Sequence, residues 1–258
     1  MSSAEFLRAD ALDPLPHGFF TRRGGVSRGP WAALNCALSG QDRPEHVAEN
    51  RARVAAALGL PPPALLGLTQ VHGASVVRVT APWPAGQGPR ADAMVTDRRG
   101  LALGIITADC APVLLADPAA GVIGAAHAGW RGAVGGVIEA TLAAMAALGA
   151  EAARVVAAVG PCIGQASYEV GPDLRAAVLE AGAAGAAFLA PGRDTAHWQF
   201  DLAGYCAARL RAAGVGRIGA VAVDTAADEA RFFSHRRRTL RGEGPIGHQI
   251  SVISLGLA

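Results

Sequence analysis

The chain has 258 residues, of which 51% are hydrophobic, and its formal net charge at pH 7 is +2. This length and apolar content are enough to bury a sizeable core, and we expect one domain that spans residues 1–258. The near-neutral charge and the lack of a long basic cluster argue against a nucleic-acid partner. Lysine and arginine together number 23, and every one is arginine, which excludes a P-loop lysine and a Schiff-base lysine.

No apolar run reaches the roughly 18 to 20 residues that a transmembrane helix needs. The first residues, 1–5, lack the basic-then-apolar pattern of a secretory signal. The four cysteines, Cys36, Cys110, Cys162 and Cys206, do not have the paired spacing of a disulfide framework. We therefore expect a cytoplasmic protein with reduced thiols and no membrane partner.

Hydrophobic periodicity predicts helices and short strands. In chain order these are helix 44–58, strands 75–80, 101–106, 113–115 and 122–126, helix 135–148, strand 155–159, helices 172–181 and 201–213, and strands 218–223 and 250–255. Only residues 81–90, rich in proline and glycine, have the composition of a flexible connection. Several strands follow one another too closely for a helix to intervene. This predicts an α+β fold, a mixed β-sheet core flanked by helices, and argues against a repeated βαβ fold.

The segment Thr107-Ala108-Asp109-Cys110 places a thiol after an apolar run. A lone cysteine in this position is usually a small, buried core residue. Asp109 and Pro112, on either side of Cys110, indicate instead that the thiol lies where a strand breaks. An adjacent carboxylate is expected to raise the pKa of a free thiol, which disfavours a bare thiolate. A divalent metal would compensate, because coordination deprotonates the thiol.

Two histidines have similar surroundings. His127 ends an apolar run and is followed by Ala128-Gly129-Trp130-Arg131-Gly132, whose small residues leave the ring approachable. His72 lies in Gln70-Val71-His72-Gly73, in a turn before a predicted strand. Two histidines and one cysteine without an obvious fourth ligand match a catalytic zinc site with an open position. The alternative is a Cys110 nucleophile with His127 as its base.

Other residues are candidates for contacts with a ligand. Arg131 offers a bidentate fork for phosphate, although a solvated loop arginine is the ordinary alternative. We interpret Cys162, within Gly160-Pro161-Cys162-Ile163-Gly164, as a pocket-lining residue; as a fourth ligand it would make the metal site structural. His235 lies among aromatic and arginine residues at 232–237. That mixture suits a base-stacking, phosphate-holding wall and equally a core segment with a solvated loop.

Together these segments resemble the YfiH-like family, also called the laccase-domain or multicopper polyphenol oxidase family. The matching segments keep their order over nearly the whole chain, so the resemblance is full-length. They are residues 20–27, 34–35, 49–51, 70–73, 91–96, 107–110, 126–132, 160–164, 200–202 and 232–237.

The resemblance implies a single α+β domain, similar to the cysteine-hydrolase fold, with zinc bound by His72, Cys110 and His127. It also implies phosphorolysis of adenosine, inosine, guanosine and methylthioadenosine to the base and ribose 1-phosphate, together with hydrolytic deamination of adenosine. Purine nucleosides and inorganic phosphate would then be the partners. Arg51, in the matching segment 49–51, becomes a further candidate for substrate binding. We expect a monomer or a small homo-oligomer.

Three alternatives stay open at this point. An older assignment within the family is copper-dependent phenol oxidation, but a multicopper enzyme needs separate copper centres and the chain has only 7 histidines. One His₂Cys site could still bind copper, so zinc is the preferred and copper the secondary expectation. Cys110 and His127 could instead act as a cysteine hydrolase, for example on peptidoglycan precursors. The third alternative is a non-catalytic zinc protein in which Cys162 closes the site.

Overall fold

The computed structural model describes residues 3–257. The strands in this part of the chain are β1 (Phe6–Leu7), β2 (His17–Phe20), β3 (Leu65–Leu66), β4 (Val76–Arg78), β5 (Ala93–Thr96), β6 (Ala102–Thr107), β7 (Ala111–Asp117), β8 (Val122–Ala128), β9 (Val156–Val159), β10 (Glu169–Val170), β11 (Leu189–Pro191), β12 (Trp198–Phe200), β13 (Arg217–Ala220) and β14 (Gln249–Ser254). The helices are α1 (Pro44–Ala57), α2 (Trp130–Val134), α3 (Val137–Ala146), α4 (Pro172–Glu180), α5 (Leu202–Ala212) and α6 (His235–Arg241). Short 3₁₀ helices lie at Asp10–Leu12, Gly29–Trp31, Pro62–Ala64, Ala152–Arg154, Gln165–Ser167 and Ala183–Phe188.

The strands of this part form three sheets, with the orders β1-β2-β14-β6-β3, β13-β9-β7-β8-β5-β4 and β10-β12-β11. Both large sheets are mixed, because β3 runs parallel to β6, β4 to β5 and β13 to β9, whereas the other neighbours are antiparallel. The predicted α+β fold with a mixed sheet core is therefore confirmed. Within residues 3–257, no helix combines the length and the apolar character needed to cross a membrane.

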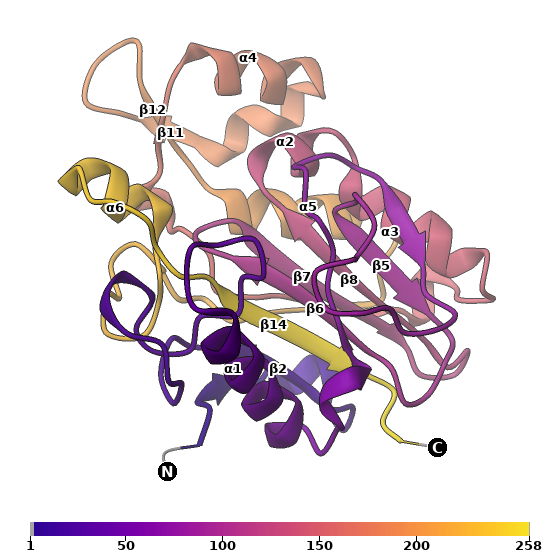
Figure 1. The fold of residues 1–258 in the computed structure, drawn as a ribbon. Coiled ribbons are helices and arrows are strands. Elements are labelled where there is room, and N and C mark those ends of the chain that lie inside the picture. The colour runs from indigo at the N-terminus through magenta and orange to yellow at the C-terminus, as the bar shows by residue number, and fades with distance from the viewer. Residues whose placement is uncertain (1–2, 258) are drawn as a thin grey trace.

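The two large sheets pack face to face between helices. In β7, Val113 and Leu115 face the core that the sheet shares with α3 and α5, whereas Leu114 and Ala116 face the other large sheet. Successive side chains of a strand point to opposite faces. Because β7 is covered on both sides, its residues 111–116 form one continuous apolar run. A third core lies between the five-stranded sheet and α1. Figure 1 shows helix α1 beneath β14.

The predicted helices are present. The helix predicted at 135–148 is α3, and Gly135 and Gly136, the latter with a φ of 89°, separate it from the preceding α2. The helix that follows His127 most closely is therefore α2, which has only 5 residues.

The predicted strands are also present, although β13 ends at Ala220 and not at residue 223. Residues 81–90 contain no helix or strand, yet they are tied to the fold and do not form a free connection. The indole of Trp83 donates a hydrogen bond to the carbonyl of Gly67 at 3.0 Å, and Thr69 N donates to Pro89 O at 3.0 Å. Sequence periodicity predicts neither β2 nor β5 nor α6.

The contact between the two large sheets depends on a missing side chain at Gly160. A Cβ there would lie 2.2 Å from two ring carbons of Phe19, which is fully buried in the inter-sheet core. We therefore expect Gly160→Ala to lower the free energy of unfolding by about 1–3 kcal/mol through overpacking. Urea denaturation measures the change. Gly244→Ala is the matched control, because a Cβ at Gly244 meets no atom within 4 Å; equal midpoints for the two variants would contradict this packing.

Candidate metal centre

The structure brings His72, Cys110 and His127 together from three separate segments. His72 lies in the turn before β4, Cys110 lies between β6 and β7, and His127 lies in β8, where it pairs with Pro112 of β7. One ligand atom of each residue lies within 4.8 Å of the other two, and Cys110 Sγ is 4.0 Å from His72 Nε2. Among residues 3–257, this is the one group of three or more histidine, cysteine or acidic residues that could hold a metal ion.

Two of the segments carry a residue with a left-handed backbone conformation. His72 has a φ of 61°, and Asp109, directly before Cys110, has a φ of 93°. Such angles are uncommon for residues other than glycine and persist where the surrounding structure holds them. The two segments must therefore be held by strong local interactions, and in each case a buried carboxylate provides them.

The carboxylate of Asp92 holds His72 and His127. It accepts hydrogen bonds from the backbone N–H groups of Val71, His72 and Gly73, and it also binds His127 Nδ1 at 2.8 Å. This leaves His127 Nε2 to face the cluster. A histidine that binds a metal through one ring nitrogen usually donates the other N–H to a carboxylate or carbonyl. Sequence reasoning did not assign Asp92 a role, although it precedes β5 within the segment 91–96.

The second carboxylate, that of Asp109, holds the Cys110 segment. Its oxygens accept hydrogen bonds from Thr225 Oγ1 at 2.7 Å, Ser234 Oγ at 2.9 Å and Arg236 N at 2.7 Å. Asp109 therefore fixes the start of α6 beside Cys110. The pKa of the thiol is lowered and not raised, because the hydrogen bonds from the two histidines outweigh burial, so the expected raised pKa was wrong.

The pKa values of Cys110 and His127 are shifted in opposite directions. Burial by itself would raise the pKa of Cys110, but hydrogen bonds from His127 and His72 outweigh it and lower this pKa to about 6. Burial would lower the pKa of His127, but hydrogen bonds with Asp92 and Cys110 outweigh it and raise this pKa to about 9. The metal-free site therefore holds a thiolate beside an imidazolium near neutral pH.

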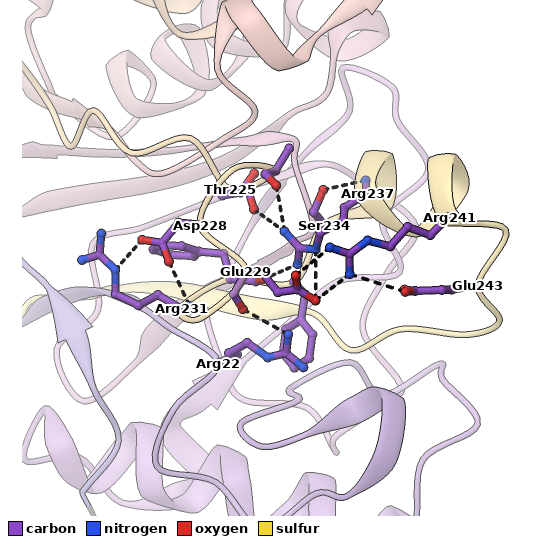
Figure 2. Close-up of polar contacts among 12 residues, drawn as sticks. Arg22, Thr225, Asp228, Glu229, Arg231, Ser234, Arg237, Arg241 and Glu243 are labelled. Carbon is purple, nitrogen blue, oxygen red and sulfur yellow. Dashed lines mark hydrogen bonds and ion pairs between the residues drawn. The ribbon is translucent and has the colours of Figure 1, made fainter.

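Helix α6 is held over the site by a network of arginines, which Figure 2 shows. Arg237 donates hydrogen bonds to the carbonyls of Thr225, Ala226 and Phe232, at 2.7 to 3.0 Å. Arg241 binds both carboxylate oxygens of Glu229 at 2.8 Å. Because α6 is anchored from this side, its opposite residues, among them His235, line the cavity that contains the ligand cluster.

That cavity has a volume of about 780 Å³, within the usual range for small-molecule sites. The cluster forms part of its wall, and three predicted contact residues, Arg51, Arg131 and His235, line it as well. Arg131 is exposed, and its guanidinium lies 4.4 Å from the ring centroid of Trp130.

Cys162 does not line the cavity, so the prediction that it is a pocket-lining residue was wrong. Its side chain is buried in the apolar core between the six-stranded sheet and the helices, and its Sγ lies against the carbonyl of Ile163. Burial raises the pKa of Cys162 well above its ordinary value, so the thiol stays protonated. The next residue, Ile163, lines the cavity instead.

The comparison with known proteins assigns the chain to a family. The profile of a family described as "Multi-copper polyphenol oxidoreductase laccase" matches residues 16–256. The chain belongs to this laccase-domain family. A Deinococcus radiodurans protein named purine nucleoside phosphorylase is 46% identical over 251 residues, which cover 96% of this laccase-domain chain and 92% of the relative. A Streptomyces coelicolor protein named purine nucleoside phosphorylase SCO2081 is 43% identical over 233 residues, covering 90% of this chain and 94% of the relative.

Solved structures of laccase-domain relatives have the same fold. Neisseria meningitidis protein NMB0706 superposes with a TM-score of 0.85 at 35% identity, covering 97% of this chain and 99% of that one. YlmD from Geobacillus stearothermophilus also gives a TM-score of 0.85, at 30% identity, covering 97% and 98% of the two chains. The family resemblance and the fold expected from the sequence motifs are both confirmed.

The donor set of this laccase-domain protein fits a divalent metal. Two imidazole nitrogens and a thiolate are ligands that zinc prefers, and three protein ligands leave one tetrahedral position open. The low pKa of Cys110 supplies the deprotonated sulfur, and Asp92 orients His127 as a supporting residue does in metal sites. His72, Cys110 and His127 would therefore hold the ion.

We expect Asp92→Asn to weaken zinc binding by about 10- to 100-fold. The asparagine keeps one acceptor oxygen. Its NH₂ group, however, would face N–H groups that donate hydrogen bonds to the carboxylate in the wild type. Titration against a chromogenic chelator measures the affinity. Asp97→Asn is the control, because Asp97 pairs with the exposed Arg78 and Arg98 and lies outside the ligand cluster. Equal zinc affinities for the two variants would contradict the role of Asp92.

The pH dependence of Cys110 alkylation tests the electrostatics of the metal-free site. The thiolate is the reactive form, and a pKa of about 6 means that the rate with iodoacetamide rises through pH 6 and levels off above pH 7. Added zinc should protect the thiol. Peptide mass spectrometry identifies the labelled residue, since the other cysteines are buried. A rate that keeps rising to pH 9 would show that the hydrogen bonds do not stabilise the thiolate.

Proposed function

We propose that this laccase-domain protein is a zinc-dependent purine nucleoside phosphorylase that also deaminates adenosine. The observation that carries the proposal is the His72–Cys110–His127 cluster in the wall of a nucleoside-sized cavity. Relatives that align over nearly the whole chain are named purine nucleoside phosphorylase, which supports the same activity. Inosine, guanosine, adenosine and methylthioadenosine would be the substrates.

The proposed phosphorolysis joins a phosphate oxygen to C1′ of the ribose while the C1′–N9 bond breaks. The electron pair of that bond goes to the purine, and the proton lost by hydrogen phosphate ends on the base. The products are the free base and ribose 1-phosphate. Deamination would convert adenosine and water to inosine and ammonia. When bound by the three ligands, zinc supplies Lewis acidity at the cavity wall.

The protein's own residues would position the substrates. Trp130 and Tyr168 line the cavity and offer aromatic faces for a purine or ribose. Burial raises the pKa of Tyr168, so its hydroxyl stays protonated and can donate a hydrogen bond. Arg131 and His235 add donors at the same wall. Because Asp109 and Arg237 hold α6, the wall is formed before the substrate binds, which lowers the entropic cost of orientation.

A second candidate function is favoured by one specific observation. Cys110, His127 and Asp92 form a thiol–imidazole–carboxylate series in which the pKa of the thiol is lowered to about 6, as in cysteine hydrolases. This candidate does not explain His72, which lies 4.0 Å from the same sulfur. Copper-dependent phenol oxidation has less support, because residues 3–257 hold one candidate metal cluster and a multicopper enzyme needs several centres.

We expect the zinc-loaded protein to convert inosine and phosphate to hypoxanthine and ribose 1-phosphate, and Cys110→Ala to abolish the reaction and lose zinc. Liquid chromatography of the base measures the turnover. Cys206→Ala is the control, because Cys206 is fully buried in the helical core and outside the cluster. No hypoxanthine from the wild type, or equal turnover by Cys110→Ala, would exclude the proposed activity. Turnover of an amide substrate that zinc inhibits would favour the hydrolase.

A further inference from the structure

Arg51 is a buried cation without an acidic partner. It lies on α1 and is 7% exposed. Within residues 3–257, its guanidinium donates hydrogen bonds only to the carbonyls of Cys36 at 3.4 Å and Leu65 at 3.1 Å. Burial lowers the pKa of Arg51, and no carboxylate of the described residues offsets that burial. Buried charges in proteins are normally paired, because an unpaired one is costly. An arginine in this state, facing a cavity, is suited to an anionic ligand.

Two further polar atoms, on side chains of residues that line the same cavity, are buried and have no hydrogen-bond partner among the described residues. They are Thr107 Oγ1 and His248 Nδ1, and the side chain of Thr107 is almost fully buried. The backbone connects them to Arg51, because Cys36 N donates to His248 O at 3.0 Å and Gln249 pairs with Thr107 in the five-stranded sheet. We call Arg51, Thr107 and His248 the inner wall.

The charges around the inner wall favour an anion. Burial, with His235, His127 and Arg238 nearby, lowers the pKa of His248 to about 4, so the ring is neutral at pH 7 and one nitrogen carries a hydrogen. Asp109 is the one acidic side chain among the cavity-lining residues of the described chain, and hydrogen bonds already occupy both of its oxygens. The inner wall therefore offers hydrogen-bond donors and a positive charge without a competing carboxylate.

We propose that the inner wall is an oxyanion subsite in which Arg51 binds inorganic phosphate. The inference rests on the proposed phosphorylase function. It assigns phosphate, the second substrate, to the buried Arg51 and not to the exposed Arg131. A buried guanidinium gains more from an anion than an exposed one, because water screens it less. The geometry leaves room for the phosphate, since Gly67 has no side chain and a Cβ there would lie 3.5 Å from Arg51 Nη2.

Direct phosphate binding and steady-state kinetics test the subsite together. In equilibrium dialysis of the zinc-loaded protein with radiolabelled phosphate, we expect Arg51→Gln to weaken binding by about 10- to 100-fold, the effect of losing hydrogen bonds to a charged group. The KM for phosphate should rise by a similar factor, whereas the KM for inosine should not change. The control is Arg53→Gln, on the same helix, because Arg53 pairs with Glu49 and does not line the cavity.

Thr107→Val keeps the test decisive if Arg51→Gln does not fold. Valine has nearly the same shape and removes a buried hydroxyl that has no protein partner, so the thermal midpoint should not fall, while phosphate binding weakens. Wild-type phosphate affinity in both variants would overturn the subsite, as would equal increases in both KM values. If the wild type binds phosphate through Arg51 but releases no hypoxanthine, the subsite stands and the phosphorylase proposal fails. If phosphorolysis occurs but depends on neither Arg51 nor Thr107, the phosphorylase proposal stands and the subsite fails.

Discussion

The carboxylate of Asp92 is the contact on which the candidate site depends. Three backbone N–H groups of the His72 turn and the ring of His127 converge on its two oxygens, and its carbonyl also accepts the backbone N–H of His127 at 2.7 Å. Asp92 is fully buried, so these hydrogen bonds replace its hydration and keep the charge in place. One side chain thus sets the position of both histidines before any ligand binds.

Asp109 plays the corresponding part on the other side of the site. It keeps the Cys110 segment in its left-handed conformation and connects it to Ser234 and Arg236 at the start of α6. The two carboxylates therefore stabilise backbone conformations that would otherwise be unfavourable, a common feature of functional sites. The cavity that Asp109 lines extends to Arg51 on α1, on the opposite side of the five-stranded sheet from the six-stranded one. Elements from both large sheets thus contribute to one binding space.

Local sequence patterns predicted many of the helices and strands, and the elements that they missed were missed for physical reasons. The helix at α1 and the strand at β14 have clear periodicity and appear nearly at the predicted bounds. Strands β2 and β5 have only 4 residues each and are buried throughout, so no alternation marks them. Helix α6 is polar and rich in arginine and lacks an apolar stripe. Its local start signal was Ser234, whose side chain accepts the N–H of Arg237 as an N-cap.

The site was predictable to the extent that residue type determines it. His72, Cys110 and His127 were recognisable as possible ligands by their chemistry, but Asp92 was not, because its role comes from a contact with His127 across β5 and β8. Asp109 was misjudged, since the sequence places its carboxylate next to the thiol whereas the backbone turns it toward Thr225. Cys162 was misplaced by one residue, because the direction of a side chain after a strand end depends on the turn that follows.

We propose that Asp92 preorganises His72, Cys110 and His127 as a three-ligand metal centre. Anomalous diffraction at the zinc absorption edge, on crystals grown with the metal-loaded protein, tests it most directly. The structure predicts one strong peak at about 2.0–2.1 Å from a ring nitrogen of each histidine and about 2.3 Å from Cys110 Sγ, with no fourth protein ligand. No peak at this cluster, or a peak that includes Cys162, would contradict the claim.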